Sequence, residues 1–234
     1  MRRGLSRRLL GVLAAVLVLG AVYVGAVEGI RSIGGLGYVP AASSATTGTH
    51  IELSAWPDSM SGCHGRDGGP HSDWVTYCST TSIRVPAYST ITVTIRQYDT
   101  GGALHNTFFD RVYGTVGGIA YLNGKPTTHI TPDVVGHTFT IQTPPNGGET
   151  QLFVSVPLPG VAANAPNVLT FNGHKYPRPS VVTFRFKTGA PGQYVWHCYV
   201  PCGTGLAGDG PSGQAGFGGP MSTIGYMAGT LTVT

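Results

Sequence analysis

The chain has 234 residues, of which 36 are glycine and 17 are proline, and only 10% are charged. This length fits one domain with a single core, and this composition favours short strands joined by turns over long helices. The formal net charge is +4, but five of the 14 basic residues lie at the N-terminal end: Arg2, Arg3, Arg7, Arg8 and Arg31. The rest of the chain lacks the basic clusters that phosphate binding needs, so no nucleic acid partner is expected.

The first predicted element is an apolar helix over residues 9–27, which carry no charge. As a helix it would be about 28 Å long, close to the thickness of a bilayer's hydrocarbon core. The arginines before it predict that the rest of the chain lies outside the cytoplasm. Two alternatives remain open: a single-pass anchor at the cell membrane, or a signal peptide whose cleavage leaves a secreted protein. We therefore divide the chain into an anchor or signal segment (1–31), a flexible linker (32–48) and one domain (49–234).

Beyond the linker, the sequence predicts short strands. Residues 90–96 alternate strictly between polar and apolar side chains, which is the pattern of a strand with one buried face. Comparable segments, bounded by Gly, Pro and Asn, are 51–56, 82–86, 119–122, 137–142, 151–156, 182–186, 193–199 and 229–234. Eight or nine such strands predict an all-β sandwich. Residues 157–179 and 203–220 break the rhythm and are expected to be surface loops.

All four cysteines lie in the exported part, where disulfides persist. Cys63 and Cys78 bracket a loop rich in Gly and Asp, and we predict that they form a structural disulfide. The alternative is a zinc site that also uses His64 and His71.

The segment with the most chemical information begins at the strand 193–199. It carries Cys198, and Cys202 follows four residues later. His137 opens an earlier strand in Gly-His-Thr-Phe, and Met227 stands just before the last strand. Thiolate, imidazole and thioether groups together are typical ligands of copper.

These residues resemble the cupredoxin superfamily, and most closely the copper A domain of cytochrome c oxidase subunit II, over residues 136–142 and 180–234. In that family a His opens one strand, a G-x-Y strand leads into a Cys-x-x-x-Cys loop, and a Met precedes the final strand. The resemblance implies a Greek-key cupredoxin-like β-sandwich that binds copper, as a mononuclear or degenerate binuclear centre, through His137, Cys198, Cys202 and Met227. It also implies electron transfer with a redox protein such as a cytochrome or a terminal oxidase. The family's second His is missing, because Leu206 stands in its place.

Three further side chains are candidate ligands: Met221, His105 and His197. Alternation along the strand turns His197 away from a site that Cys198 faces. Cys198 and Cys202 could instead form a second disulfide, and the chain would then be a metal-free or copper-storing and copper-delivering structural module. A third hypothesis is an accessory subunit of a haem-copper oxidase. We expect no catalysis by the chain alone, since these ligands would enclose the metal and no hydrolase motif is present.

Overall fold

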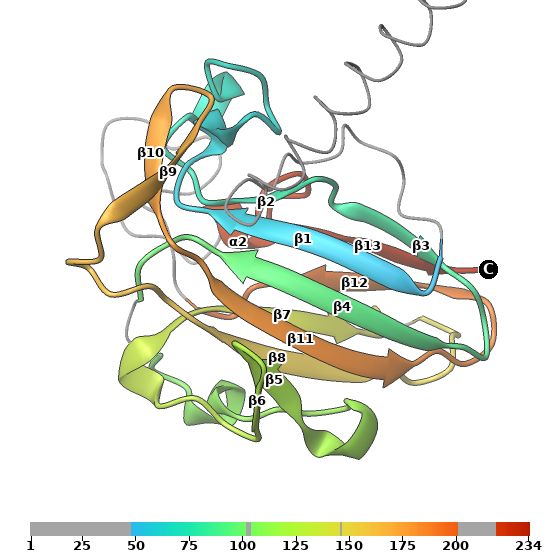
Figure 1. Cartoon of the computed structure of the whole chain (residues 1–234). Helices are drawn as coiled ribbons and strands as arrows, with labels where there is room; N and C mark the ends of the chain where they lie inside the picture. Colours follow the sequence, from blue (N-terminus) through green and yellow to red (C-terminus); the bar gives the residue numbers. More distant parts are fainter. Residues whose placement is uncertain (1–47, 102–103, 146, 201–218) are drawn as a thin grey trace, which may run out of the picture. The chain divides into compact units, whose positions relative to one another are not determined.

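The computed structural model describes residues 48–101, 104–145, 147–200 and 219–234, and they form an all-β domain (Figure 1). The predicted segment 1–31, the linker except Gly48, Cys202 and nearly all of the Gly-rich loop 203–220 lie outside the described residues. Among the residues that are described, no helix is long and apolar enough to cross a membrane. The only α-helix in them is the four-residue α2 (Gly219–Ser222), as the composition predicts.

The larger sheet has six strands in the order β2-β1-β4-β11-β5-β6. Its strands, in chain order, are β1 (His50–Trp56), β2 (Thr76–Cys78), β4 (Thr90–Gln97), β5 (Ala120–Leu122), β6 (Lys125–Thr127) and β11 (Ser180–Lys187). β1 and β4 run parallel, whereas β4 and β11 are antiparallel along their whole length.

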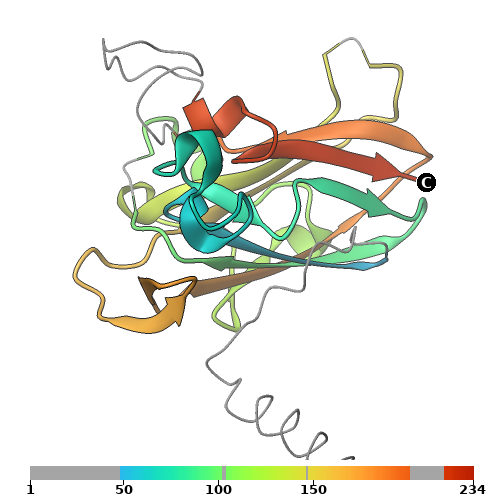
Figure 2. The same cartoon turned by 90° about the horizontal axis from the view of Figure 1, so that it is seen from above.

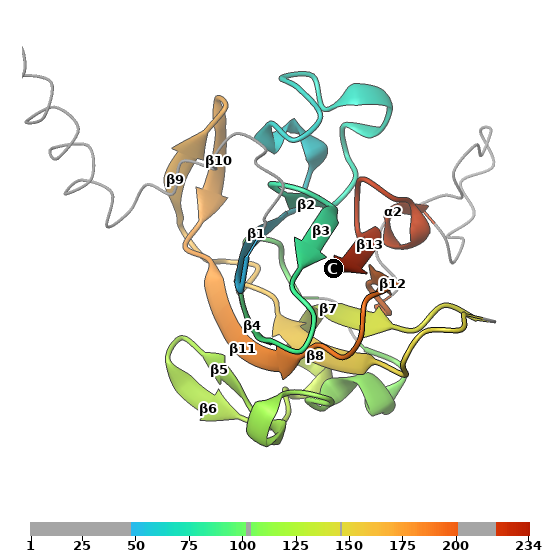
Figure 3. The same ribbon diagram turned by 90° about the vertical axis from the view of Figure 1, so that its right-hand side faces the viewer.

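The second sheet has five strands in the order β3-β13-β12-β7-β8. Its strands, in chain order, are β3 (Ser82–Val85), β7 (Val135–Gln142), β8 (Phe153–Pro159), β12 (Gly192–His197) and β13 (Ala228–Val233). The two sheets stack face to face, as the end-on view shows (Figure 3). All nine strands expected from the sequence are present, within a few residues of their predicted bounds.

The core lies between the two sheets and follows from the alternation in the sequence. Ile91, Val93 and Ile95 of β4 are fully buried, and the polar residues between them face outward. From the other sheet, Phe139 packs against the ring of Trp196 with centroids 4.9 Å apart. This rigid apolar interior is the support on which β7 and β12 hold their side chains.

The prediction that residues 157–179 are a surface loop is wrong. Part of β8 and a separate hairpin, β9 (Asn167–Phe171) and β10 (His174–Pro177), occupy it. The hairpin turns at Asn172-Gly173, where both residues have positive φ, a dipeptide that favours tight two-residue turns. Its side chains close a second small core over Trp56, whose ring contacts those of Phe171 and Tyr176.

The disulfide prediction is confirmed, since Cys63 and Cys78 are bonded to each other. No thiolate is then left at this loop for the zinc alternative. The loop instead packs against the segment before β13: the ring of His64 stacks on Tyr226 at 4.3 Å, and Tyr77 N donates to Tyr226 O. The two segments lie side by side in the view from above (Figure 2).

Candidate metal centre

Neighbouring strands bring His137 and Cys198 together. β7 and β12 are antiparallel neighbours, with Thr140 opposite His197, so the start of β7 lies beside the residues that follow β12. Inward-facing positions on β12 are Tyr194 and Trp196, and Cys198 continues that series. The side chains of His137 and Cys198 are each only 1% exposed.

The sulfur of Cys198 lies among hydrogen-bond donors. His137 Nδ1 is 3.7 Å from Cys198 Sγ, and the backbone N–H groups of Thr138 and Val200 each point at the sulfur from 3.4 Å. Donors aimed at a sulfur favour its negatively charged form, which is the form that binds metals. Cys198 Sγ also lies 3.6 Å from Val200 O, which accepts from the protonated thiol, so the site accommodates both the thiol and the thiolate.

The separation of these two atoms fits ligands of one metal ion. With metal–sulfur and metal–nitrogen bonds of about 2.3 and 2.0 Å, bond angles near 110–120° place the two donors about 3.5–3.7 Å apart. The observed distance is 3.7 Å, which matches the separation expected for two ligands of one ion. The imidazole and the sulfur form a donor pair that suits copper.

Met227 is tied to Cys198 through the backbone. Cys198 N donates to Met227 O at 3.1 Å, and Met227 N donates to Pro220 O at 2.8 Å. The Met227 side chain is completely buried and that of Met221 is 2% exposed, and both belong to the same core cluster as Cys198. The structure thus places Met227 next to Cys198 along the backbone, whereas Met221 shares only the large core cluster with Cys198.

The second nitrogen of His137 meets a carboxylate. His137 Nε2 lies 2.9 Å from Asp99 Oδ2. Burial by itself lowers the pKa of His137, but the hydrogen bonds to Asp99 and Cys198 outweigh it and raise the pKa to about 9. His137 therefore holds two protons at neutral pH in the metal-free protein, and a metal would have to displace the one on Nδ1.

The remaining candidate ligands are placed elsewhere. His197 turns to the other face of its strand, as alternation predicts, where its Nε2 lies 3.2 Å from Gln142 Nε2 and its ring packs on Tyr199. Burial lowers the pKa of His197. His105 is exposed in the loop before the 3-10 helix η3 (Thr107–Asp110). Within the described ranges, no group of three or more His, Cys, Asp or Glu side chains is placed to hold a metal.

Two supporting residues were not found from the sequence. Thr138 Oγ1 accepts the backbone N–H of Tyr199 at 2.8 Å and so anchors the chain just after Cys198. Asp99 comes two residues after β4, in Tyr-Asp-Thr, which matches no known motif. The only signal in the sequence was that Asp99 closely follows the predicted strand 90–96, which indicates a position near the edge of the sandwich.

Comparison with known proteins gives distant structural likeness only. No family model matches the chain, and no curated protein matches it. Auracyanin B shares 15% identity and a TM-score of 0.30, with 85% of this chain and 96% of that one covered. Reduced auracyanin from Roseiflexus castenholzii has 18% sequence identity and a TM-score of 0.30, with 83% of this chain and 99% of that one covered. The copper protein rusticyanin has 14% sequence identity and a TM-score of 0.33, with 89% of this chain and 94% of that one covered. These values do not assign the chain to a family, so its function has to be inferred from its own residues.

Proposed function

We propose that this protein is a copper-binding electron-transfer protein of the cupredoxin type, similar to oxidase subunit II, held at the outer face of the cell membrane by residues 9–27. The observation that carries the proposal is the buried pair of His137 Nδ1 and Cys198 Sγ, 3.7 Å apart. A buried imidazole whose pKa is raised, beside a buried sulfur that accepts two N–H groups, is the kind of perturbed and enclosed pair that functional sites contain.

Each side chain has a distinct role in this proposal. Cys198 would supply a thiolate and His137 an imidazole, Met227 would be a weak thioether donor, and Cys202, four residues after Cys198, would supply a second thiolate. Met221 is the alternative thioether. Copper held there would exchange single electrons with a partner. Burial would keep water from His137, Cys198 and Met227, and their position on or next to packed strands would keep them in place as the charge of the metal changes.

The partner would be a redox protein such as a cytochrome or a terminal oxidase. If all four proposed donors held the metal, they would leave no position open for a substrate, and the chain would transfer electrons without catalysing a reaction itself. The apolar segment and the linker would hold the domain near a membrane-bound partner.

A second candidate is a metal-free or copper-storing and copper-delivering module with Cys198 and Cys202 oxidised. It is favoured by the missing second imidazole, since Leu206 stands where the family has a His. Its fold would be the same, but no stable coloured copper complex would form.

The test is to load the full chain with copper(II) and record visible absorption and EPR spectra. We expect sulfur-to-copper charge-transfer bands in the wild type, which Cys198→Ser and His137→Ala abolish. His197→Ala is the matched control, because His197 neighbours Cys198 but faces away, and it should keep the bands. Cys202→Ser separates a centre with two thiolates, whose spectrum it changes, from one with a single thiolate.

Contrary results have clear meanings. A colourless wild type with Cys198 and Cys202 joined would support the metal-free module. Bands that survive in His137→Ala but disappear in His197→Ala would overturn the proposed ligand set.

A further inference from the structure

The contact between Asp99 and His137 joins the candidate centre to the protein surface. One ring nitrogen of His137 faces Cys198 and the other faces the Asp99 carboxylate at 2.9 Å. The His137 side chain is 1% exposed and that of Asp99 is 18% exposed. Asp99 therefore lies at the boundary between the buried site and solvent.

The backbone holds Asp99 firmly. Its Oδ1 accepts from Thr100 N at 2.7 Å, its own N–H donates to Gln97 Oε1 at 3.3 Å, and its carbonyl accepts from Val161 N at 2.9 Å. The first bond orients the carboxylate itself, and the other two hold the backbone that carries it. The free oxygen, Oδ2, is left for His137.

Gly136 lets β7 approach the turn after β4 that carries Asp99. β7 has an irregular register between Val135 and His137, which places Gly136 against the turn that carries Asp99. A Cβ at position 136 would lie 2.9 Å from Thr100 O and 3.0 Å from Gln97 Nε2, too close for any side chain. The close contact between Asp99 and His137 thus depends on a glycine at this position.

We infer that Asp99 is the positioning residue of the candidate centre: its carboxylate accepts the Nε2–H of His137 and so turns Nδ1 toward Cys198. Without this bond the ring could rotate about its Cβ–Cγ bond and present carbon to the sulfur. Carboxylates commonly orient metal-binding histidines in this way. The inference rests on the proposed function for its metal, but the orientation of the ring exists without one.

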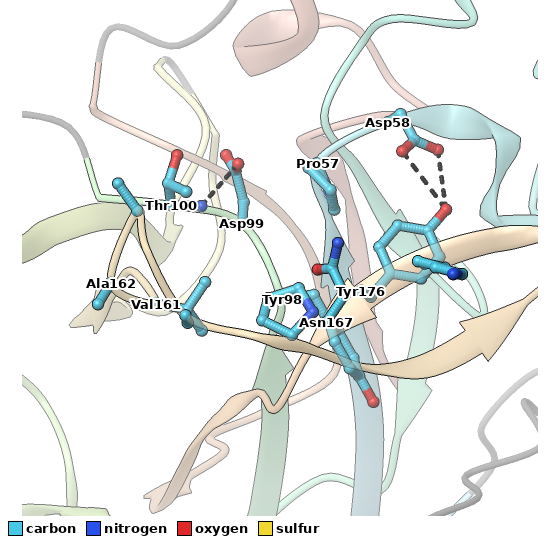
Figure 4. A pocket seen from close by; sticks show the side chains of 13 residues that line it. Pro57, Asp58, Tyr98, Asp99, Thr100, Val161, Ala162, Asn167 and Tyr176 are labelled. Carbon is cyan, nitrogen blue, oxygen red and sulfur yellow. Dashed lines mark hydrogen bonds between the residues drawn. The ribbon is translucent and has the colours of Figure 1, made fainter.

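Asp99 can be reached by small solutes. It lines a pocket of about 190 Å³, together with Tyr98, Asn167 and Tyr176. Figure 4 shows Asp99 beside Thr100 on one side of this pocket, with Asp58 and Tyr176 on the other. Removing the Asp99 side chain would leave a space, open to this pocket, that formate is small enough to enter.

The test uses ¹⁵N NMR of the full chain without metal. In the wild type we expect a downfield, slowly exchanging Nε2-bound proton on His137. Asp99→Ala should lose it, and formate should restore it, whereas chloride at equal ionic strength should not. Asp58→Ala is the matched control, because Asp58 is the other carboxylate of the pocket and bonds to Tyr176 instead; its His137 signal should match the wild type.

Copper binding provides a second measurement. Asp99→Ala should weaken copper binding by about 10–100-fold, the usual cost of removing such a partner, and formate should recover part of the loss. An unchanged His137 signal in Asp99→Ala would overturn the inference whether or not copper binds. If the wild type binds no copper but the NMR results are as expected, the proposed function fails and the positioning contact is supported.

Discussion

Raising the pH from 6.5 to 9 should weaken the metal-free fold by roughly 3 kcal/mol through His137. Its pKa is raised from 6.5 to about 9 in the folded protein, and each unit of difference corresponds to about 1.4 kcal/mol. Because folding raises this pKa, the stabilisation is complete below pH 6.5 and is lost as the pH approaches 9. Burial lowers the pKa of His197, so that group acts in the opposite direction and weakens the fold below pH 6.5. Stability should therefore be highest near pH 6.5.

The assay is urea unfolding of the full chain in the presence of a chelator, followed by tryptophan fluorescence at several pH values in this range. His137→Gln should be less stable than the wild type at pH 6.5 and should lose little more as the pH rises. His50→Gln, at an exposed position, should follow the wild type. If wild type and His137→Gln lose stability in parallel between pH 6.5 and 9, the reasoning about the buried contacts of His137 is refuted.

Cys63→Ala, which opens the bridge to Cys78, should lower the free energy of unfolding by about 3 kcal/mol, measured by urea titration, because the unfolded chain regains its loop entropy; an unchanged free energy of unfolding would contradict this. Gly229→Ala should cost about 1–3 kcal/mol, since a Cβ there would overlap the backbone oxygen of Thr81 and lie 2.6 Å from the ring of Trp196; an unchanged Tm would rule out that crowding. Met227→Leu should raise the reduction potential of the copper-loaded protein, because losing a thioether donor disfavours copper(II); an equal potential by spectroelectrochemistry would remove Met227 from the ligand set.

The strands that were predicted correctly have local signals. Alternation along β4 and β11 specifies which side chains are buried, and it does so without knowledge of their neighbours. β9 and β10 were missed although Asn172-Gly173 marks a turn, because this hairpin alternates poorly and is stabilised by its contacts with Trp56. Tertiary packing there outweighs the local pattern.

The all-β class, the Cys63–Cys78 bridge, the candidate donors His137, Cys198 and Met227 and the outward turn of His197 could be predicted from the sequence, since periodicity, cysteine placement and residue chemistry can be read along the chain. The folded domain adds that His137 Nδ1 faces Cys198 Sγ and that Asp99 holds the second nitrogen of His137. Those facts depend on the register of β7 against β12 and on the close approach at Gly136. Such alignments join residues tens of positions apart, and no local pattern in the chain encodes them.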